Sequence, residues 1–323
     1  MTKVVITDHR FPDVEQERHA VEALGGQLIV GQVTGEAELI DLCRDADGVL
    51  NGRAKITAGV IAAMKHCRII VRYGIGVDTI DIPAATERGI MVANVPDYCV
   101  DEVSDHALTL LLMLSRQAIP SIAVARQDIW ALTSLGPLHR LRGQVCGLFG
   151  AGRIGSLVAS KVAPLGMQVL VHDPYLSESQ ARAMGAELVS FDHLLARSDF
   201  ISLHAPLTGE TRHRFGEAAF AKMKASAFII NTARGGLVDE AALLKALDAG
   251  RIAGAGLDAV ESESVVTPTR TALVNHPKIV VTAHTAWLSV EARVTLQARA
   301  AAQVAACLKG EKPYGLINRP LAK

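Results

Sequence analysis

Short apolar runs rich in β-branched residues recur along the chain, and each is followed by a stretch with helical spacing of its apolar positions. The first series of runs covers 3–8, 27–30, 48–51, 68–73 and 91–95, and the second covers 144–149, 168–173, 200–205, 227–232, 253–258 and 278–284. Strands that alternate with helices form parallel sheets covered by helices on both faces. The pattern therefore predicts an α/β fold with two doubly wound parallel sheets.

Two longer helices are predicted outside this alternation. Residues 101–116 begin with acidic side chains, as the helix dipole favours, and place Val103, Leu110, Leu111 and Leu114 on one face. We interpret this helix as the connector between the two series, and an Ala-rich helix is expected at about 289–308. A chain of 323 residues is long for one core and suits two domains.

Composition narrows the class of protein. The 33 basic residues equal the 33 acidic residues, so no overall charge attracts nucleic acid or an anionic membrane. The five cysteines are odd in number and far apart, which favours reduced thiols over disulfides or a metal site. The longest apolar run, 107–114, is too short to cross a bilayer, and the first residues lack the apolar stretch of a signal peptide. We expect a cytoplasmic protein without nucleic-acid, membrane or metal partners.

The stretch GLFGAGRIG at 147–155 contains the spacing G-x-G-x-x-G. Three fixed positions are weak evidence alone, but this loop follows a predicted strand and precedes a predicted helix, which is the setting of a dinucleotide site. Gly150 would permit the tight turn, Gly152 would let backbone approach a pyrophosphate, and Gly155 would let helix and strand pack closely. We therefore predict that Gly150, Gly152, Arg153, Ile154 and Gly155 bind a dinucleotide at the helix N-terminus.

Asp173 ends the next predicted strand, about 20 residues beyond the glycine loop. A carboxylate there can accept hydrogen bonds from both hydroxyls of an adenosine ribose and would repel a 2′-phosphate. The following Pro174 and Tyr175 supply no cation. The sequence therefore predicts NAD rather than NADP.

Polar residues follow the later strands of the second series where each strand ends: His204, Thr232 with Arg234, Asp258, and His284. Ligands of doubly wound sheets bind beyond these carboxyl ends. His284 is suited to carry a proton near neutral pH, and Arg234 could bind a substrate carboxylate through two hydrogen bonds. Glu261 and Glu263, in the preceding loop, are both candidates for the carboxylate beside His284.

Several motifs together resemble one family. GLFGAGRIG, NTARGGLVDEAAL, GAGLDAVESE and TAHTAW, preceded by RYGIGVDTID and ANVPDYCVDEVSDHAL, are similar to the NAD-dependent D-2-hydroxyacid dehydrogenases over nearly the whole chain. PDYCVDEVSDHAL and Trp287 are most similar to the C-terminal-binding-protein-like branch of that family. The resemblance implies interconversion of a D-2-hydroxy acid and its 2-keto acid by hydride transfer.

The resemblance also implies residue roles. Arg234, Glu263 and His284 would form the catalytic set, with Arg234 as the substrate clamp. The cofactor would contact Ala205 and Pro206 near its adenosine and Thr232, Ala233 and Asp258 at its nicotinamide end. Backbone N–H groups of Gly74, Ile75 and Gly76 would bind the substrate carboxylate, and Trp287 would form a wall for the substrate side chain.

The same resemblance implies the domain organisation. A Rossmann NAD-binding domain would cover 100–289, and a flavodoxin-like substrate domain would combine 1–99 with 290–323. Two subunits would pair into a homodimer through their NAD-binding domains.

The chain departs from the family pattern at three places. Ser264 and Ala283 stand where proline often follows the catalytic acid and precedes the histidine, and Asn51 stands where many members have arginine, with Arg53 two residues on. Two alternative functions therefore stay open: an NAD(H)-sensing regulatory binding protein on the same fold, and a phosphite-type dehydrogenase. Glu263 argues against a formate dehydrogenase, in which glutamine would pair with the histidine.

Other polar residues are given structural interpretations. We expect Asp239 to cap the helix that follows it, because the segment DEAALLKALDAG starts with acid and ends in glycine. His204 is expected to satisfy backbone groups at a strand end. His193 and His213 are expected in loops.

Overall fold

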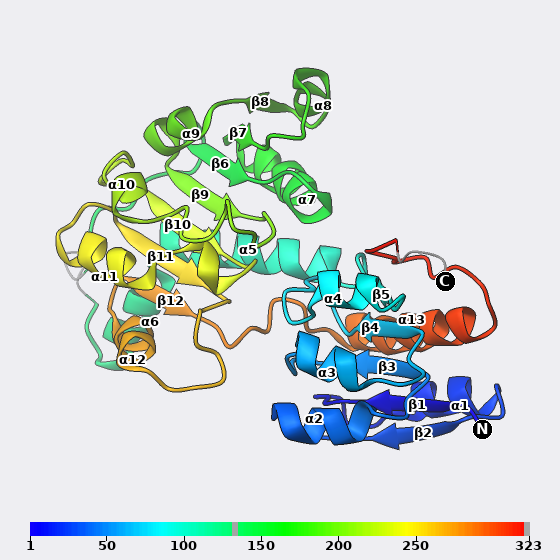
Figure 1. Cartoon of the computed structure of the whole chain (residues 1–323). Coiled ribbons are helices and arrows are strands. Elements are labelled where there is room, and N and C mark those ends of the chain that lie inside the picture. The colour runs from blue at the N-terminus through cyan, green and yellow to red at the C-terminus, as the bar shows by residue number, and fades with distance from the viewer. Residues whose placement is uncertain (131–134, 320–323) are drawn as a thin grey trace. The chain divides into compact units, whose positions relative to one another are not determined.

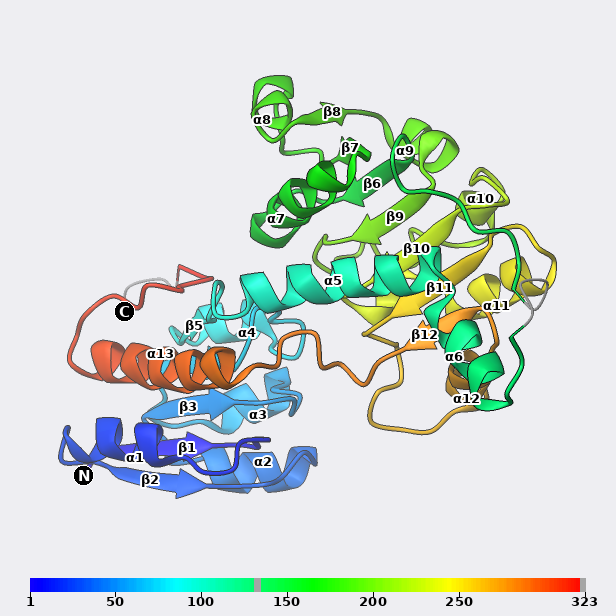
Figure 2. The same ribbon diagram turned by 180° about the vertical axis from the view of Figure 1, so that it is seen from behind.

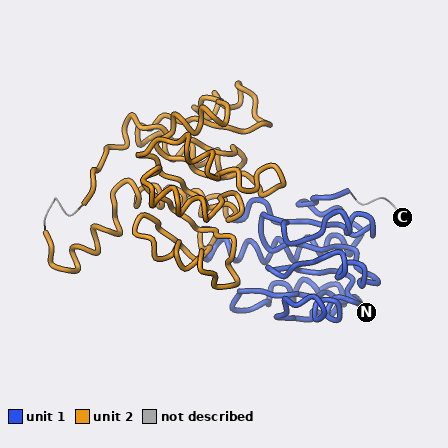
Figure 3. Tube along the Cα trace, turned by 60° about the vertical axis from the view of Figure 1, so that its left-hand side comes forward, with its two compact units in different colours: residues 1–98, 289–323 blue, residues 99–288 orange. Residues whose placement is uncertain are grey.

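The computed structural model describes residues 1–130 and 135–319 and divides into two compact units. Unit 1 combines Met1–Tyr98 with the segment that starts at Ser289, and unit 2 is Cys99–Leu288 (Figure 3). The predicted domain boundaries differ from these limits by one residue at each crossing, and residues 320–323 of the predicted first domain lie outside the described residues.

Unit 1 is built on a five-stranded parallel sheet with the order β2-β1-β3-β4-β5 (Figure 1). Its strands are β1 (Lys3–Ile6), β2 (Gln27–Val30), β3 (Gly48–Asn51), β4 (Ile69–Arg72) and β5 (Met91–Ala93). This is the flavodoxin-like order, in which the direction of winding reverses between β1 and β3. The predicted flavodoxin-like sheet is thereby confirmed.

Helices cover both faces of this sheet. The helices of unit 1 are α1 (Glu15–Glu22), α2 (Glu36–Cys43), α3 (Ala58–Ala63), α4 (Ile82–Glu87) and α13 (Val290–Leu308). Helices α1 and α13 lie together on one face, and α2, α3 and α4 follow one another on the other (Figure 2). The chain's last long helix thus completes the first sheet because β3 and β4 offer it an apolar surface.

Unit 2 is built on a seven-stranded parallel sheet with the order β12-β11-β10-β9-β6-β7-β8. Its strands are β6 (Val145–Phe149), β7 (Gln168–His172), β8 (Ala186–Leu188), β9 (Phe200–Leu203), β10 (Phe228–Asn231), β11 (Gly254–Leu257) and β12 (Ile279–Val281). This is the Rossmann order with one added strand, and winding reverses between β6 and β9. The strands β9 and β10 are buried along most of their length, as expected for a sheet covered on both sides.

The helices of unit 2 form two layers over separate apolar clusters. They are α5 (Val100–Ser115), α6 (Ala118–Arg126), α7 (Arg153–Val162), α8 (Glu178–Ala183), α9 (Phe191–Arg197), α10 (Glu217–Phe220), α11 (Glu240–Asp248) and α12 (Pro268–Asn275), with single 3₁₀ turns at Ala163–Leu165 and Gly235–Leu237. Helices α5 and α7 pack against one cluster, and α9, α10, α11 and α12 pack against the other.

Two elements differ from the sequence predictions. Strand β8 was not predicted, because its three residues are too few to show alternation and it is an edge strand. Helix α6 was not predicted, because it has no buried residue and therefore no apolar face against a core. His193 lies in α9 and not in a loop, since Ser190 caps that helix through a hydrogen bond from the His193 N–H (3.2 Å).

Among the described residues, no single helix is long and apolar enough to cross a membrane. Helices α5 and α6 pass such a test of length and composition only as a pair, and they are bent by 57° at the break between them. The four apolar residues that the sequence placed on one face of α5 are all buried in the fold, as in the core helix of a globular unit.

Candidate active site

The glycine loop after β6 has the packing that its spacing predicts. Gly150 has φ +93°, and a Cβ there would lie 2.9 Å from the backbone nitrogen of Ala205. A Cβ on Gly155 would lie 2.3 Å from the carbonyl oxygen of Gly150. A Cβ on Gly152 would meet nothing within 4 Å, so this position borders open space. Two glycines are thus required by the fold, and the third leaves room for a ligand.

Helix α7 begins at Arg153, and no side chain caps its N-terminus at Gly152. The first N–H groups of an α-helix have no partner within the helix, so this end suits an anion. Arg153, Ile154 and Gly155 form the first turn that the sequence assigned to the pyrophosphate. Ala205 and Pro206 follow β9, the strand beside β6, which puts Ala205 against Gly150 at the switch point of the sheet.

Asp173, after β7, holds the glycine loop from the side. Its carboxylate accepts hydrogen bonds from the N–H of Ala151 (2.9 Å) and from the N–H of Tyr175 (2.9 Å). A carboxylate has about four lone-pair positions, so two remain for a ribose. Asp173 therefore fixes the loop and retains the capacity that the sequence prediction requires.

The loop after β10 carries Thr232, Ala233 and Arg234. Asn231, which is fully buried, accepts a hydrogen bond from the Ala233 N–H (3.0 Å) and donates one to the Arg234 carbonyl (2.8 Å). The sequence analysis did not single out Asn231, although its place at the end of a buried strand was a signal. Within the described residues, the hydroxyl of Thr232 is buried and has no hydrogen-bond partner.

His284 and Glu263 are brought together. The Nδ1 atom of His284 lies 2.5 Å from Oε1 of Glu263, and the side chains are 28% and 24% exposed. Glu261 instead accepts from Nε2 of His213 (2.6 Å) and lies 3.6 Å from Arg212. Glu263, which the family resemblance placed in the catalytic set, is therefore the carboxylate beside His284, and Glu261 pairs with His213 instead.

The backbone at His284 adopts φ +54°, a left-handed conformation that few residues other than glycine take. Asp258, at the end of β11, holds it there. Its carbonyl accepts from the His284 N–H (2.9 Å), and its carboxylate accepts from the N–H groups of Thr285 and Ala286 (2.9 Å each) and from the Thr282 hydroxyl (2.5 Å). Asp258 was assigned to the nicotinamide end, and its carboxylate also anchors the histidine loop.

His106 on α5 extends this network. Its Nε2 atom lies 2.9 Å from the Thr282 hydroxyl oxygen and 3.6 Å from the Asp258 carboxylate. Because the single proton of Thr282 is donated to Asp258, the hydroxyl oxygen accepts from His106, whose Nε2 atom therefore carries a proton. The sequence placed His106 on a helix and gave no signal of this contact.

Arg234 is half-buried, and its Nη1 atom donates to the carbonyl of Ala233 (2.9 Å). The next residue, Gly235, approaches another loop so closely that a Cβ would lie 2.1 Å from the carbonyl carbon of Val260. The Arg234 loop is therefore packed against the loop that leads to Glu263.

In unit 1, the loop Gly74–Gly76 follows β4. Gly74 has φ +143°, its carbonyl accepts from the Val95 N–H (3.1 Å), and the Ile75 carbonyl accepts from the side-chain amide of Asn94 (2.6 Å). Asn51 is fully buried, and its amide donates to Thr7 and to the Ala54 carbonyl. Asn51 therefore makes its hydrogen bonds inside unit 1. Trp287 lies in unit 2, three residues after His284, and is half-buried.

Comparison with known proteins identifies the family. Residues 108–286, more than half of the chain, match the family model described as D-isomer specific 2-hydroxyacid dehydrogenase, NAD binding domain. The chain belongs to this family.

Relatives within the family carry several names. The chain is 40% identical to a D-3-phosphoglycerate dehydrogenase of Mycobacterium leprae over 92% of its own length, but it spans only 56% of that relative. It is 36% identical to a glyoxylate reductase of Korarchaeum cryptofilum, covering 88% of the chain and 86% of the relative. A D-lactate dehydrogenase of Aquifex aeolicus, complexed with NAD and lactic acid, superposes with a TM-score of 0.87 at 28% identity, covering 95% and 96% of the two chains.

The NAD-binding domain of this dehydrogenase-family chain fits its cofactor on structural grounds. The open space at Gly152, the uncapped start of α7 and the unpartnered hydroxyl of Thr232 lie in the loops that follow β6 and β10. These loops are at the carboxyl ends of parallel strands, where a dinucleotide binds. The described residues contain no group of three His, Cys, Asp or Glu side chains arranged to hold a metal ion.

His204 differs from its predicted role. Its Nε2 atom lies 2.9 Å from the Ser202 hydroxyl, so its partner is a side chain and not the backbone. Burial lowers the pKa of His204 to about 4, which keeps it neutral. Asp239 does cap α11, as predicted, because its carboxylate accepts from the Ala242 N–H (3.0 Å).

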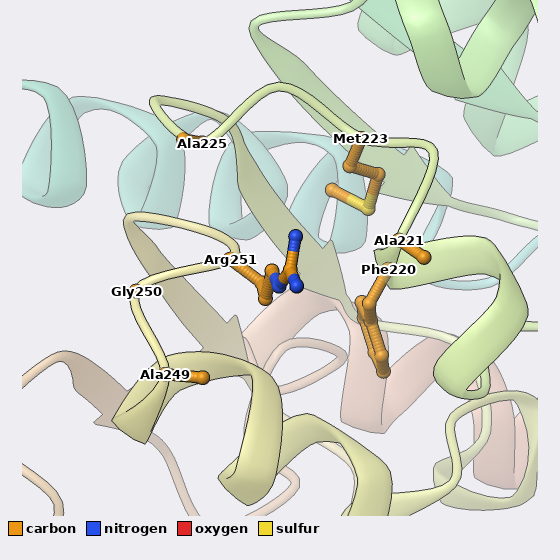
Figure 4. Close-up of a pocket in the computed structure, with 7 residues that line it drawn as sticks. All are labelled: Phe220, Ala221, Met223, Ala225, Ala249, Gly250 and Arg251. Carbon is orange, nitrogen blue, oxygen red and sulfur yellow. The ribbon is translucent and has the colours of Figure 1, made fainter.

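A surface hollow of about 340 Å³ lies away from these residues. It is lined by Phe220, Ala221, Met223, Ala225, Ala249, Gly250 and Arg251 (Figure 4). Its walls are the loops that precede β10 and β11, whereas the candidate active-site residues follow those strands. The hollow therefore lies at the amino-terminal ends of the strands, and none of the predicted site residues lines it.

Proposed function

We propose that this protein is an NAD-dependent oxidoreductase that interconverts a D-2-hydroxy acid and its 2-keto acid. The observation that carries the proposal is the pair formed by His284 and Glu263, whose ring nitrogen and carboxylate oxygen are 2.5 Å apart in the NAD-binding unit. An imidazole held by a carboxylate is suited to move a proton near neutral pH. Family membership supports the same reaction class.

The glycine loop, Asp173 and Thr232 would hold NAD, which would supply the acceptor for a hydride from C2 of the hydroxy acid and, as NADH, the hydride for the keto acid. Nδ1 of His284 faces Glu263, which leaves Nε2 to remove the proton from the substrate hydroxyl in oxidation and to return it in reduction. The Glu263 carboxylate stabilises the imidazolium in both directions. Asp258 holds the backbone of the histidine loop, and the Thr282 hydroxyl donates to the same carboxylate, so the imidazole is positioned before the reaction begins.

We assign the remaining roles as the family resemblance implies. Arg234 binds the substrate carboxylate and the C2 oxygen, and the N–H groups of Gly74, Ile75 and Gly76 bind the same carboxylate. Trp287 forms a wall for the substrate side chain. The hydrogen bonds from Asn94 and Val95 to the carbonyls of the Gly74 loop support its role in substrate binding, because they fix the backbone of that loop.

The decisive experiment combines the purified protein with NADH and a panel of 2-keto acids that includes glyoxylate, and with NAD and D-lactate or D-3-phosphoglycerate. We expect at least one acid to change the absorbance of the reduced nicotinamide continuously. NADH binding with no turnover of any acid would instead support the NAD(H)-sensing function. Turnover of NAD with phosphite and with none of the acids would support the phosphite-type alternative.

We do not transfer the substrate of the phosphoglycerate dehydrogenases, because the chain spans about half the length of those relatives. The C-terminal-binding-protein-like branch likewise stays a proposal that rests on PDYCVDEVSDHAL and Trp287. The relatives compared with this chain are named as a phosphoglycerate dehydrogenase and a glyoxylate reductase, and neither name is that of the branch. NADH binding without turnover would support the NAD(H)-sensing function that this branch can have.

We also propose a homodimer formed through unit 2. Helix α6 has no buried residue, yet Ile119 and Ile122 are apolar and each 48% exposed, and Trp130 nearby is 83% exposed. Apolar side chains gathered on one exposed segment are typical of a surface that a partner covers. A second copy of the chain can present the same segment in return, which makes a symmetric contact.

Light scattering after size-exclusion chromatography tests the dimer. We expect the wild-type protein to have twice the mass of one chain and the double variant Ile119→Lys, Ile122→Lys to have the mass of one. Val274→Lys, at an exposed apolar position of α12, is the matched control and should stay dimeric. A wild-type monomer, or a dimer that survives the double change, would contradict the proposal.

A further inference from the structure

The loop from β11 to α12 carries Glu263 and lacks the proline that often follows the catalytic acid. Ser264 stands there instead, so the chain has no ring that would fix the backbone φ angle after Glu263. A loop with this freedom would leave the carboxylate free to turn away from His284. Other contacts must therefore hold the Glu263 carboxylate in place.

Arg270 holds this loop from α12. Its Nη1 atom donates to the carbonyl oxygens of Ser262 (3.2 Å), Glu263 (3.1 Å) and Val265 (3.3 Å). These carbonyls belong to Glu263 itself and to residues before and after it along the chain. One guanidinium therefore gathers the backbone that surrounds the acid, through hydrogen bonds that its positive charge strengthens.

The base of Arg270 is itself fixed. Thr267 caps α12, and its hydroxyl accepts a hydrogen bond from the backbone N–H of Arg270 (3.1 Å), while Pro268 occupies the first turn. Leu273, one turn later, is fully buried in the core of unit 2. The guanidinium thus reaches back from an anchored helix.

The beginning of the loop has a separate anchor. The Glu261 N–H donates to the carboxylate of Glu240 (2.7 Å), a buried residue at the start of α11, and Gly235 packs against Val260. The segment from Ser262 to Val265 lies between this anchor and α12, and the guanidinium of Arg270 holds its backbone. Glu263 lies in this part.

We propose that Arg270 is a positioning residue that keeps the Glu263 carboxylate against His284 in place of the missing proline. The inference rests on the proposed function, because it assumes that Glu263 and His284 act together. Arg270 is not a catalytic residue: it acts only through the backbone of the acid loop. Its loss should therefore matter only while a carboxylate is present at position 263.

The test is a double-mutant cycle of Arg270→Met with Glu263→Gln, measured with the acid that the wild-type protein turns over. Methionine keeps an aliphatic stem and removes the donors. We expect Arg270→Met to lower kcat about 10-fold and to change the dissociation constant of NADH less than 2-fold. In the Glu263→Gln protein the same change should alter kcat less than 2-fold, because the contact it supports is already lost.

A conservative substitution gives a second readout. Arg270→Lys, which keeps the charge, should recover part of kcat. Arg251→Met is the matched control. It changes an exposed arginine at the amino-terminal ends of the strands and should keep wild-type kcat.

The outcomes are distinguishable. A wild-type kcat in Arg270→Met, or the same loss with and without Glu263, would overturn the role of Arg270 while leaving the proposed function intact. If Arg270→Met does not fold, Arg270→Lys and its cycle with Glu263→Gln decide by the same criterion. Absence of turnover in the wild-type protein would instead count against the proposed function, before any variant is compared.

Discussion

The glycine loop and the two acid–base loops of unit 2 are held by different means. Gly150 and Gly155 fix the dinucleotide loop through close approach, because no side chain fits where they pack. The loops of Glu263 and His284 are fixed by side chains that bind their backbone, namely Arg270 from the following helix and Asp258 from the end of β11. The first device is a close approach of backbone to backbone that excludes a side chain, and the second is a set of hydrogen bonds from one side chain to the backbone of a loop.

The largest effect is expected at His284. The change His284→Asn removes the proton carrier and keeps a residue that tolerates the left-handed backbone at φ +54°. We expect kcat to fall about 10²- to 10⁴-fold while NADH still binds. Steady-state kinetics and fluorescence titration of NADH measure the two quantities, and an unchanged kcat would refute the role of His284.

The glycine loop should separate stability from affinity. In Gly155→Ala the new Cβ would lie 2.3 Å from the Gly150 carbonyl, so the backbone must shift, at a cost of about 1–3 kcal/mol in the free energy of unfolding and with loss of NADH binding. Gly152→Ala meets no protein atom within 4 Å and should weaken NADH binding without changing stability. Urea unfolding and NADH titration check both. Equal stability of the two variants would show that close packing does not fix this loop.

The histidine loop should depend on one hydroxyl. Thr282→Val removes the donor to Asp258 and the acceptor for His106 while keeping the side-chain shape, and we expect kcat to fall on the order of 10-fold. Thr282→Ser keeps the hydroxyl and should stay within about 2-fold of the wild type, well under the loss of a full hydrogen bond. If valine and serine variants have the same kcat, the hydroxyl does not position His284.

A separate effect concerns stability in acid and leaves the candidate site unchanged. The pKa of His204 is about 4 in the folded protein against 6.5 in the unfolded chain, because burial disfavours the charged form. The unfolded chain therefore binds a proton first as the pH falls, and stability present above pH 6.5 is lost between pH 6.5 and 4. This loss is at most about 3 kcal/mol.

Urea unfolding at several pH values measures the effect. In His204→Asn the fall in stability across that pH range should be smaller than in the wild type. His193→Asn, at an exposed position of α9, is the control and should keep the wild-type slope. An unchanged slope in His204→Asn would show that other groups cause the acid sensitivity.

Much of the fold could be predicted because most strands and the two long helices show a regular pattern of apolar residues along the chain. Eleven of the strands were expected from their β-branched runs, and α5 and α13 from helical periodicity, since such elements bury a regular face. Strand β8 and helix α6 lacked that signal: one is a three-residue edge strand and the other buries no residue. The candidate site was predicted in part, and Asn231, Thr282 and His106 were missed because their partners are chosen by the fold.

By itself the sequence determined the alternation of strands and helices, the glycine loop with its acid, and the family of the protein, because each depends on residues near one another along the chain. The folded structure was needed to show that Glu261 pairs with His213, that the Asp258 carboxylate anchors the histidine loop, and that Arg270 binds the backbone around Glu263. A hydrogen bond tolerates only a few tenths of an ångström of change in the distance between donor and acceptor, and the order of residues does not fix that distance.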